Sequence, residues 1–311
     1  MSDSMVMTVT GPKRVDELGT TLCHEHLLID LYSVYQPHRD MYLHDLDLAA
    51  REVFEFADSG GGTIVDLTTP DIGRNPLLLR QLSEQTGVSV VMGCGRYRGP
   101  FYEPGLDART TASLADEFVE EIECGVDGIL PGVIGEIGTD GRFVTGIEER
   151  VHRAAARAAN RTGLSLVTHS LGSSVGLAQL DLLQEEGLPP ERIAIGHADT
   201  WPDHDYHLDL AERGVYLLFD TLRGTVPYET ERALRCYQVL ANAGFGGRVL
   251  FSHDVCGTAH YRAYGGNGYT FVGGDLLRQA EDAGIDPADI RQSLTSSAHA
   301  FLTGSAVQAW A

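Results

Sequence analysis

Two histidines near the start of the chain are spaced to bind a metal ion. His24 and His26 form a His-x-His pair behind the β-branched residues Thr20 and Thr21. Because side chains two apart lie on the same face of an extended strand, both imidazoles would face one point. Two unrelated surface histidines would give the same short pattern, so its meaning depends on residues further along the chain.

The remaining candidate ligands follow or end short apolar segments. They are Glu136 in GVIGEIG, His169 in LVTHS, His197 in IGHAD and Asp254 in FSHD. Taken singly, His169 or His197 could be a hydrogen-bonded core histidine, and Asp254 could cap the segment that follows it. Glu136 is harder to explain as an ordinary core residue, because burying a carboxylate is costly unless it is paired or bound to a metal.

Four imidazoles and two carboxylates form a donor set that suits zinc, and also manganese, cobalt or nickel. Six ligands are too many for one tetrahedral zinc, but they suit two ions that share a carboxylate and a water. Two metals about 3.5–4 Å apart lower the pKa of a bridging water and polarise a carbonyl or phosphoryl oxygen. The sequence therefore predicts two divalent metal ions, with zinc as the first choice, and a bridging hydroxide nucleophile.

The elements that must carry these residues alternate along the chain. Core strands are expected at Thr20–Leu22, Thr63–Leu67, Val88–Met92, Val133–Ile137, Leu164–Thr168, Arg192–Ile195, Val215–Phe219 and Val249–Ser252, with helical segments between most of them. This alternation indicates right-handed βαβ units and a parallel sheet. Eight strands favour an α/β fold, a (β/α)8 TIM barrel preceded by a short strand pair within Val6–Asp16. The six candidate ligands would then meet at the rim formed by the C-terminal strand ends.

A doubly wound sheet is the alternative fold, but it would need a G-x-G-x-x-G turn that this chain lacks between a strand and a helix. No linker or shift in composition divides residues 1–311, so one domain is expected. The Leu31–Asp45 segment lacks periodicity and is expected to be a long loop that could act as a lid. The five cysteines are scattered without C-x-x-C spacing, which indicates buried apolar residues.

Charge and hydropathy restrict the partners. The chain has 311 residues and a formal charge of −21, which repels nucleic acid and anionic membranes at long range. A small-molecule substrate is therefore the expected partner. The sequence contains no apolar run long enough to cross a bilayer and no signal-peptide pattern at its start, so a cytoplasmic location is expected.

The order of ligands resembles that of the phosphotriesterase-like family of the amidohydrolase superfamily. The opening VTGPKRVDELGTTLCHEHLLID and the later HDVCGTAHYRAYGGNGY carry this resemblance, which covers essentially the whole chain. It implies a metal-dependent hydrolase in which His24, His26 and Asp254 hold the more buried metal. His169 and His197 would hold the more exposed one, and a homodimer is usual in the family.

Position 136 departs from the pattern of many family members, which bridge the metals with a carbamylated lysine. This chain has Glu136 there, and its only lysine is Lys13. It is therefore similar to the glutamate-bridged branch, the phosphotriesterase homology and phosphotriesterase-related proteins. The departure argues against efficient hydrolysis of organophosphates.

Two aspartates are the candidate catalytic residues. Asp254 is expected both to bind a metal and to accept a proton from the nucleophile, which requires hydrogen-bond reach. Asp199, two residues after His197, is a candidate to relay that proton or to orient a histidine, with a solvated loop aspartate as the alternative. His253 is expected to pack on the opposite face from Asp254. The other histidines expected at the surface are His38, His44, His152, His204, His207 and His299.

Specificity is expected to come from the rim loops. Tyr97 matches a tyrosine that lies beside the metals in related lactonases, so it is a candidate contact for the substrate, or else a half-buried core residue. The rim arginines are Arg96, Arg98, Arg223 and Arg262. One or two of them would bind an anionic substrate through the planar guanidinium, and the others would form surface ion pairs.

The first functional interpretation is a binuclear metal hydrolase that cleaves a carboxylic ester, in particular a lactone that carries an anionic group. The second is a related hydrolase of an amide or a phosphoester. The third is a catalytically silent binding protein on the same barrel, which is disfavoured because every expected ligand position is filled.

Overall fold

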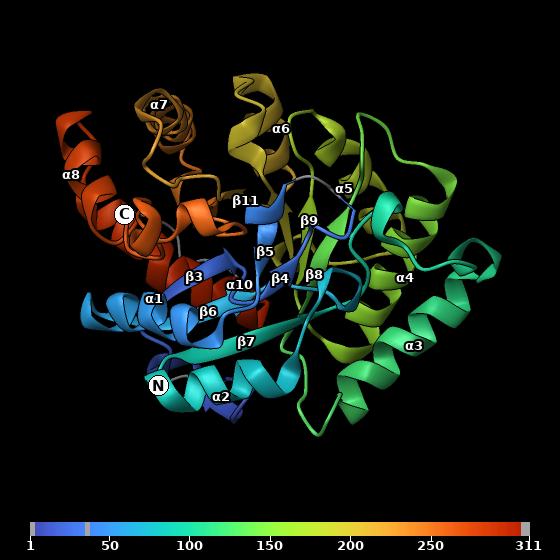
Figure 1. Cartoon of the computed structure of the whole chain (residues 1–311). Coiled ribbons are helices and arrows are strands. Elements are labelled where there is room, and N and C mark those ends of the chain that lie inside the picture. Colours follow the sequence, from blue (N-terminus) through green and yellow to red (C-terminus); the bar gives the residue numbers. More distant parts are fainter. Residues whose placement is uncertain (1–3, 35–37, 306–311) are drawn as a thin grey trace.

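The computed structural model describes residues 4–34 and 38–305. Eight parallel strands form one sheet that curls into a nearly closed barrel, with helices around it (Figure 1). Neighbours in the sheet follow the order of the chain, as expected for consecutive βα units. The strands are β3 (Thr20–Glu25), β6 (Gly61–Asp66), β7 (Ser89–Cys94), β8 (Val133–Gly138), β9 (Leu166–His169), β10 (Ile193–Gly196), β11 (Tyr216–Phe219) and β12 (Val249–Phe251). The predicted TIM barrel is confirmed.

The seam between β12 and β3 is closed by Ser252 and Asp254. His24 N donates to Ser252 Oγ at 3.0 Å, and Ser252 Oγ donates to the His24 carbonyl at 2.9 Å. Asp254 N donates to the same carbonyl at 3.1 Å. Because these bonds replace a strand ladder, the end of the last strand is fixed against the first strand, and Asp254 is placed beside His24.

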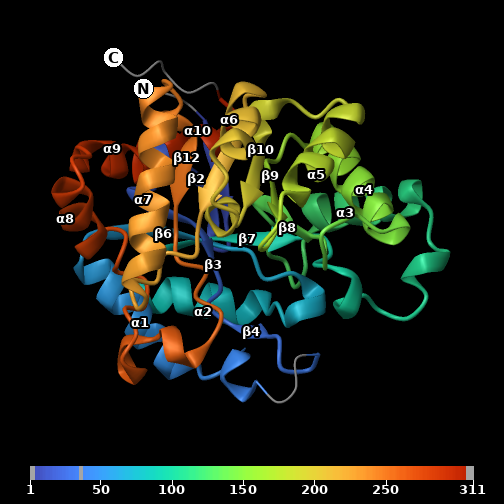
Figure 2. The same ribbon diagram turned by 90° about the horizontal axis from the view of Figure 1, so that it is seen from above.

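Helices cover the outside of the barrel, as the view from above shows (Figure 2). They are α1 (Leu46–Asp58), α2 (Pro76–Thr86), α3 (Thr111–Cys124), α4 (Gly146–Thr162), α5 (Val175–Glu185), α6 (His204–Glu212), α7 (Pro227–Asn242), α8 (Asp275–Asp282), α9 (Pro287–Gln292) and α10 (Ala298–Thr303). Polar N-caps begin many of them, and Thr145 with Glu148 forms a capping box at the start of α4. These caps satisfy amide groups that a helix start leaves without a partner.

Two small antiparallel sheets flank the barrel. The N-terminal pair, β1 (Met5–Thr8) and β2 (Gly11–Arg14), confirms the predicted strand pair. In the second, β4 (Ile29–Asp30) pairs with β5 (Tyr42–Leu43), so the segment predicted as a loop over Leu31–Asp45 ends in a strand. Residues 35–37 of that segment lie outside the described residues.

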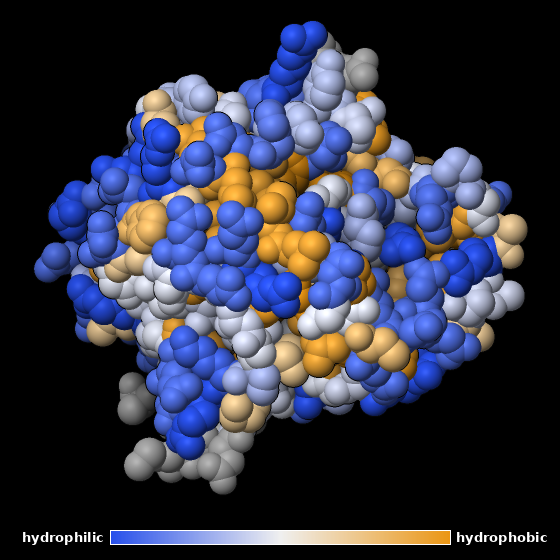
Figure 3. All heavy atoms as spheres, turned by 60° about the horizontal axis from the view of Figure 1, so that its bottom comes forward, coloured by the Kyte–Doolittle hydropathy of each residue, from blue (hydrophilic) through white to orange (hydrophobic). Residues whose placement is uncertain are grey.

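Apolar side chains fill two layers. One layer lies inside the barrel and includes Val65, Val91, Val133 and Val167, and a larger one lies between the strands and the helices. On the face shown in Figure 3, hydrophilic residues surround an apolar strip. Among the described residues, no helix is long and apolar enough to cross a membrane. All five cysteines are free, and four are buried as expected, but Cys124 at the end of α3 is exposed.

Candidate metal centre

Glu136 stands at the centre of the six predicted ligands, on the inner face of β8. Its Oε2 lies 2.8 Å from His169 Nδ1, 3.4 Å from His24 Nε2 and 3.5 Å from His197 Nε2. Its Oε1 lies 3.5 Å from His26 Nε2. One buried carboxylate therefore contacts four buried imidazoles that come from three different segments of the chain.

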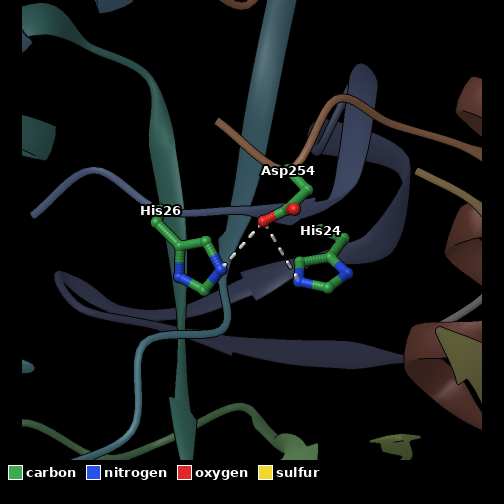
Figure 4. Close-up of side chains that lie close together, drawn as sticks. All are labelled: His24, His26 and Asp254. Carbon is green, nitrogen blue, oxygen red and sulfur yellow. Dashed lines mark ion pairs between the residues drawn. The ribbon is translucent and has the colours of Figure 1, made fainter. Parts of the chain in front are cut away.

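The six predicted ligands form two groups, each compact enough to hold one ion, and a third compact group joins His24 and His197 to Asp220. His24, His26 and Asp254 make the first group (Figure 4), and Glu136, His169 and His197 make the second. Asp254 Oδ1 lies 3.3 Å from His26 Nε2 and 3.9 Å from His24 Nε2. The division into groups matches the one that the family resemblance implies, while ligation itself stays a prediction.

Asp220, which the sequence reasoning missed, orients one histidine of each group. It follows β11, and its Oδ2 lies 2.6 Å from His24 Nδ1 while its Oδ1 lies 2.7 Å from His197 Nδ1. A carboxylate at these distances favours protons on both Nδ1 atoms, which leaves the lone pairs of both Nε2 atoms, on the side of Glu136, available to a metal ion. The signal for Asp220 was present in the sequence: an acid follows the apolar run VYLLF at the end of a predicted strand.

The residues fit a pair of divalent cations. His24 Nε2 is buried and has no hydrogen-bond partner among the described residues, as expected for an atom that binds a metal. Burial lowers the pKa of His24, but Asp220 and Glu136 outweigh it and raise the pKa to about 10. In the same way, Asp254 and Glu136 raise the pKa of His26 to about 9 against its burial. The buried carboxylates thus attract positive charge, which metal ions would supply.

The backbone is strained at two of the ligand positions. Three non-glycine residues have positive φ among the described residues, and two of them are His197 at 57° and Asp254 at 52°. Such conformations persist where the surroundings hold them, and they concentrate at functional sites. His197 N donates to the Asp220 carboxylate, and the Asp254 carbonyl accepts from Arg223 Nη2 at 2.8 Å, so both residues are held from outside.

Asp199 does not occupy the position expected of a proton relay. Its carboxylate accepts hydrogen bonds from Asp220 N at 3.2 Å and from the Thr221 hydroxyl, and within the described part of the chain it bonds neither to His197 nor to Asp254. The prediction assumed an extended segment after His197, whereas residues 198–200 form a 3-10 turn that points Asp199 toward the end of β11. Burial and the neighbouring Asp220 raise the pKa of Asp199 to about 6.

The rim pocket, a cavity of about 470 Å³ over this centre, is lined by Glu136, Asp254 and three of the predicted substrate contacts. The hydroxyl of the buried Tyr97 lies 3.4 Å from His169 Nδ1. Arg98 donates to Asp140 Oδ1 at 2.5 Å, and Arg223 Nη2 donates to Asp254 Oδ2 at 2.6 Å. Both arginines therefore face the pocket while paired with a carboxylate.

Two arginines predicted for the rim do not line this pocket. Arg262 donates to Thr270 Oγ1 and lies 3.8 Å from Glu55, while Arg96 pairs with Glu117. The sequence placed Arg262 in the loop after β12. The turn η9 (Thr258–His260) of this loop reaches the pocket through His260, whereas the Arg262 side chain, which follows this turn, does not line it. Arg262 therefore lies outside the rim pocket where the sequence led us to expect it, and its contact with a substrate stays a prediction.

The other histidines were partly misassigned. His152 and His207 are buried rather than at the surface, because they lie on the inner faces of α4 and α6, where Nδ1 of His152 bonds to the Glu148 carbonyl and Nε2 of His207 to the Ala198 carbonyl. His253 packs away from the centre against Glu25, as predicted. His260, which the sequence reasoning did not single out, lines the rim pocket.

Residues 4–302 match the model of the phosphotriesterase family. The chain belongs to this family. The phosphotriesterase homology protein of Escherichia coli is 34% identical over 288 residues, which cover 92% of this chain and 98% of that protein. Its crystal structure with phosphate in the active site has a TM-score of 0.88, with 33% identity, and covers 92% of this chain and 99% of that one.

Two further relatives carry functional names. An N-acetyltaurine hydrolase of Dictyostelium discoideum is 29% identical, and the match covers 88% of this chain and 77% of that protein. The crystal structure of the lactonase Lmo2620 from Listeria monocytogenes has a TM-score of 0.87 and 27% identity, covering 96% of this chain and 99% of that one. A glutamate stands at the centre of this chain's site, which agrees with the predicted glutamate-bridged branch.

Proposed function

We propose that the chain is a hydrolase that uses two divalent metal ions to cleave a carboxylic ester, in particular a lactone that bears an anionic group. The observation that carries this proposal is that the two groups of predicted ligands, His24 with His26 and Asp254, and Glu136 with His169 and His197, lie next to each other at the rim pocket. His24, His26 and Asp254 would hold one ion and His169 with His197 the other, with Glu136 between them. Bound there, the ions would polarise a carbonyl oxygen and lower the pKa of a water.

In this proposal, Asp254 would accept the proton of the attacking water. Its Oδ1 faces His24 and His26, while its Oδ2 is bonded to Arg223. Burial raises the pKa of Asp254, but Arg223 and His26 outweigh it and hold the pKa below its usual range, so the carboxylate is charged at neutral pH. Arg223 also binds the Asp254 carbonyl, and this double contact fixes the orientation of the carboxylate.

In this proposal, Tyr97 and Arg98 would orient the substrate. The Tyr97 hydroxyl lies beside His169 on the pocket wall, where it can donate a hydrogen bond to a substrate oxygen. The Arg98 guanidinium lies 5.0 Å from the centre of the Tyr97 ring, and the side chain of its partner Asp140 is 46% exposed. An anionic substituent could therefore share the Arg98 charge with Asp140, which supports the choice of an anionic lactone. The phosphate found in the active site of the Escherichia coli relative also supports an anionic ligand.

The test is proton release from a panel of lactones with and without a phosphate or carboxylate group, measured with a pH indicator on metal-loaded protein. Ester cleavage at neutral pH releases a proton, and we expect the anionic lactones to react faster than the neutral ones. Asp254→Asn should abolish the signal, while Asp209→Asn, an exposed change on α6, should not. Silence across the panel with metal bound would refute the lactonase proposal.

An amide is the second candidate substrate, because a relative is named N-acetyltaurine hydrolase. The sulfonate of N-acetyltaurine is an anion that a guanidinium such as that of Arg98 can bind through hydrogen bonds. Amide cleavage nearly cancels its own proton release, since the freed amine takes up the proton. Formation of taurine and acetate should therefore be followed by proton NMR with the same two variants, and absence of both products would exclude this candidate.

A further inference from the structure

His260 lies at the end of η9, in the loop after β12, and lines the rim pocket together with Asp254 and Gly257. It belongs to none of the three-ligand groups, and neither the sequence pattern nor the metal chemistry gives it a role. Its main chain is well held, because His260 N donates to the Gly257 carbonyl and the His260 carbonyl accepts from Gly268 N. The ring therefore has a defined position in the pocket wall.

The protein backbone determines which ring nitrogen of His260 carries the proton. Cys256 N donates a hydrogen bond to His260 Nδ1 at 3.2 Å, so Nδ1 is the acceptor and a neutral ring must carry its proton on Nε2. Burial, helped by the charge of Arg223, lowers the pKa of His260 to about 4, so the ring is neutral near pH 7. Among the described residues, Nε2 has no hydrogen-bond partner.

A neutral N–H donor in the wall of a substrate pocket has one kind of complement, an oxygen that accepts a hydrogen bond. The two arginines that line the pocket already bond to carboxylates, Arg98 to Asp140 and Arg223 to Asp254. His260 differs from them because it offers a donor without a net charge and, among the described residues, without a competing acceptor. It can therefore donate a hydrogen bond to an oxygen of the substrate, whether or not that oxygen carries a charge.

We propose that His260 determines substrate specificity by donating a hydrogen bond from Nε2 to an oxygen outside the scissile ester group, either a hydroxyl or an anionic oxygen. The inference rests on the proposed function, since it takes a lactone as the substrate. It adds that the preferred lactone carries an oxygen substituent that reaches the loop after β12.

Three γ-lactones test this role on the full metal-loaded chain: unsubstituted γ-butyrolactone, a hydroxylated analogue and a carboxylated analogue. His260→Gln keeps an N–H donor near the position of Nε2, whereas His260→Leu removes it. Both variants remove the acceptor for Cys256 N, so the difference between them isolates the donor. His204→Leu, at an exposed histidine of α6, is the matched control.

We expect His260→Leu to lower kcat/KM for the two oxygenated lactones by about tenfold, through KM, and to leave γ-butyrolactone within about twofold. His260→Gln should recover most of the loss. The carboxylated lactone should lose more than the hydroxylated one if the oxygen is anionic, and less if it is a hydroxyl. An equal loss for all three lactones would indicate a merely structural role, and no loss for any of them would also overturn the proposal.

Two further measurements keep the proposal independent of turnover. Histidine nitrogen NMR of the chain, assigned through the signal missing in His260→Gln, should show a neutral ring protonated at Nε2 near pH 7; a proton on Nδ1 would overturn the assignment. If no lactone is cleaved, the proposed function fails, and the dissociation constants of the same three lactones then decide the role of His260. Weaker binding of the oxygenated lactones to His260→Leu alone would support it, and equal or undetectable binding would refute it.

Discussion

Replacing Asp220 by asparagine should weaken metal binding although Asp220 is not one of the six predicted ligands. The Asp220 carboxylate bonds to Nδ1 of His24 at 2.6 Å and to Nδ1 of His197 at 2.7 Å. An asparagine side chain has one acceptor oxygen, so it can serve only one of these N–H groups. Its NH2 group would face the other imidazole, which would then have to place its proton on Nε2, the atom that must bind the metal.

The size of the effect follows from this geometry. Loss of a hydrogen bond that orients a metal-binding histidine typically lowers metal affinity by about 10–100-fold, or about 1.4–2.7 kcal/mol. Because His24 belongs to one group and His197 to the other, the loss can fall on either ion. Asp220→Ala serves neither N–H group and should weaken both ions, so it should lose more than Asp220→Asn.

Metal content after dialysis against a graded series of chelator concentrations measures this affinity for each variant. Asp209→Asn, exposed on α6, is the control for a lost negative charge, and thermal unfolding of the metal-free proteins separates metal loss from misfolding. Retention of both ions by Asp220→Asn at the chelator concentrations that the unmodified chain tolerates would refute the reasoning.

Three further predictions follow from the same structure. The metal-free chain should take up divalent metal again in buffer without bicarbonate, because Glu136, unlike a lysine, needs no carbamylation. A requirement for bicarbonate, measured as the metal content of the chain, would contradict this prediction. Burial lowers the pKa of His152 in the folded chain, so the unfolded chain takes up the proton first as the pH falls. The free energy of unfolding should therefore decrease as the pH drops below about 6.5, by up to about 1.4 kcal/mol per pH unit. Urea unfolding at about pH 7.5 and about pH 5.5 should show a smaller drop for His152→Gln, and an unchanged drop would refute the assignment. Gly62→Ala should cost about 1–3 kcal/mol, since a Cβ there would lie 2.2 Å from the Leu18 carbonyl oxygen. Gly141→Ala, where a Cβ meets nothing within 4 Å, should unfold like the unmodified chain, and equal denaturation midpoints for the two variants would count against the packing argument.

Many residues of the candidate site could be predicted from the local sequence. A parallel barrel brings the C-terminal ends of its strands to one rim, so a polar residue at the end of an apolar segment has a predictable place. His169 ends β9 and His197 follows β10 directly, and both lie beside Glu136 as expected. The absence of lysine beyond Lys13 excluded a lysine carbamate without any coordinates. These inferences hold because they depend on strand order and residue type alone.

Other features depended on which side chains meet across the rim. Arg223 pairs with Asp254, and Asp220 bonds to two histidines that are far away in the sequence. No local sequence pattern predicts these contacts, because they join distant segments of the chain. The turn that redirects Asp199 and the hydrogen bond that fixes the tautomer of His260 depend on backbone conformation within single loops. The sequence by itself therefore determined the barrel and its candidate ligands, because both follow from periodicity and strand order. Only the tertiary structure decided how those candidate ligands are oriented and which rim residues line the pocket, because hydrogen bonds and ion pairs require contact in space.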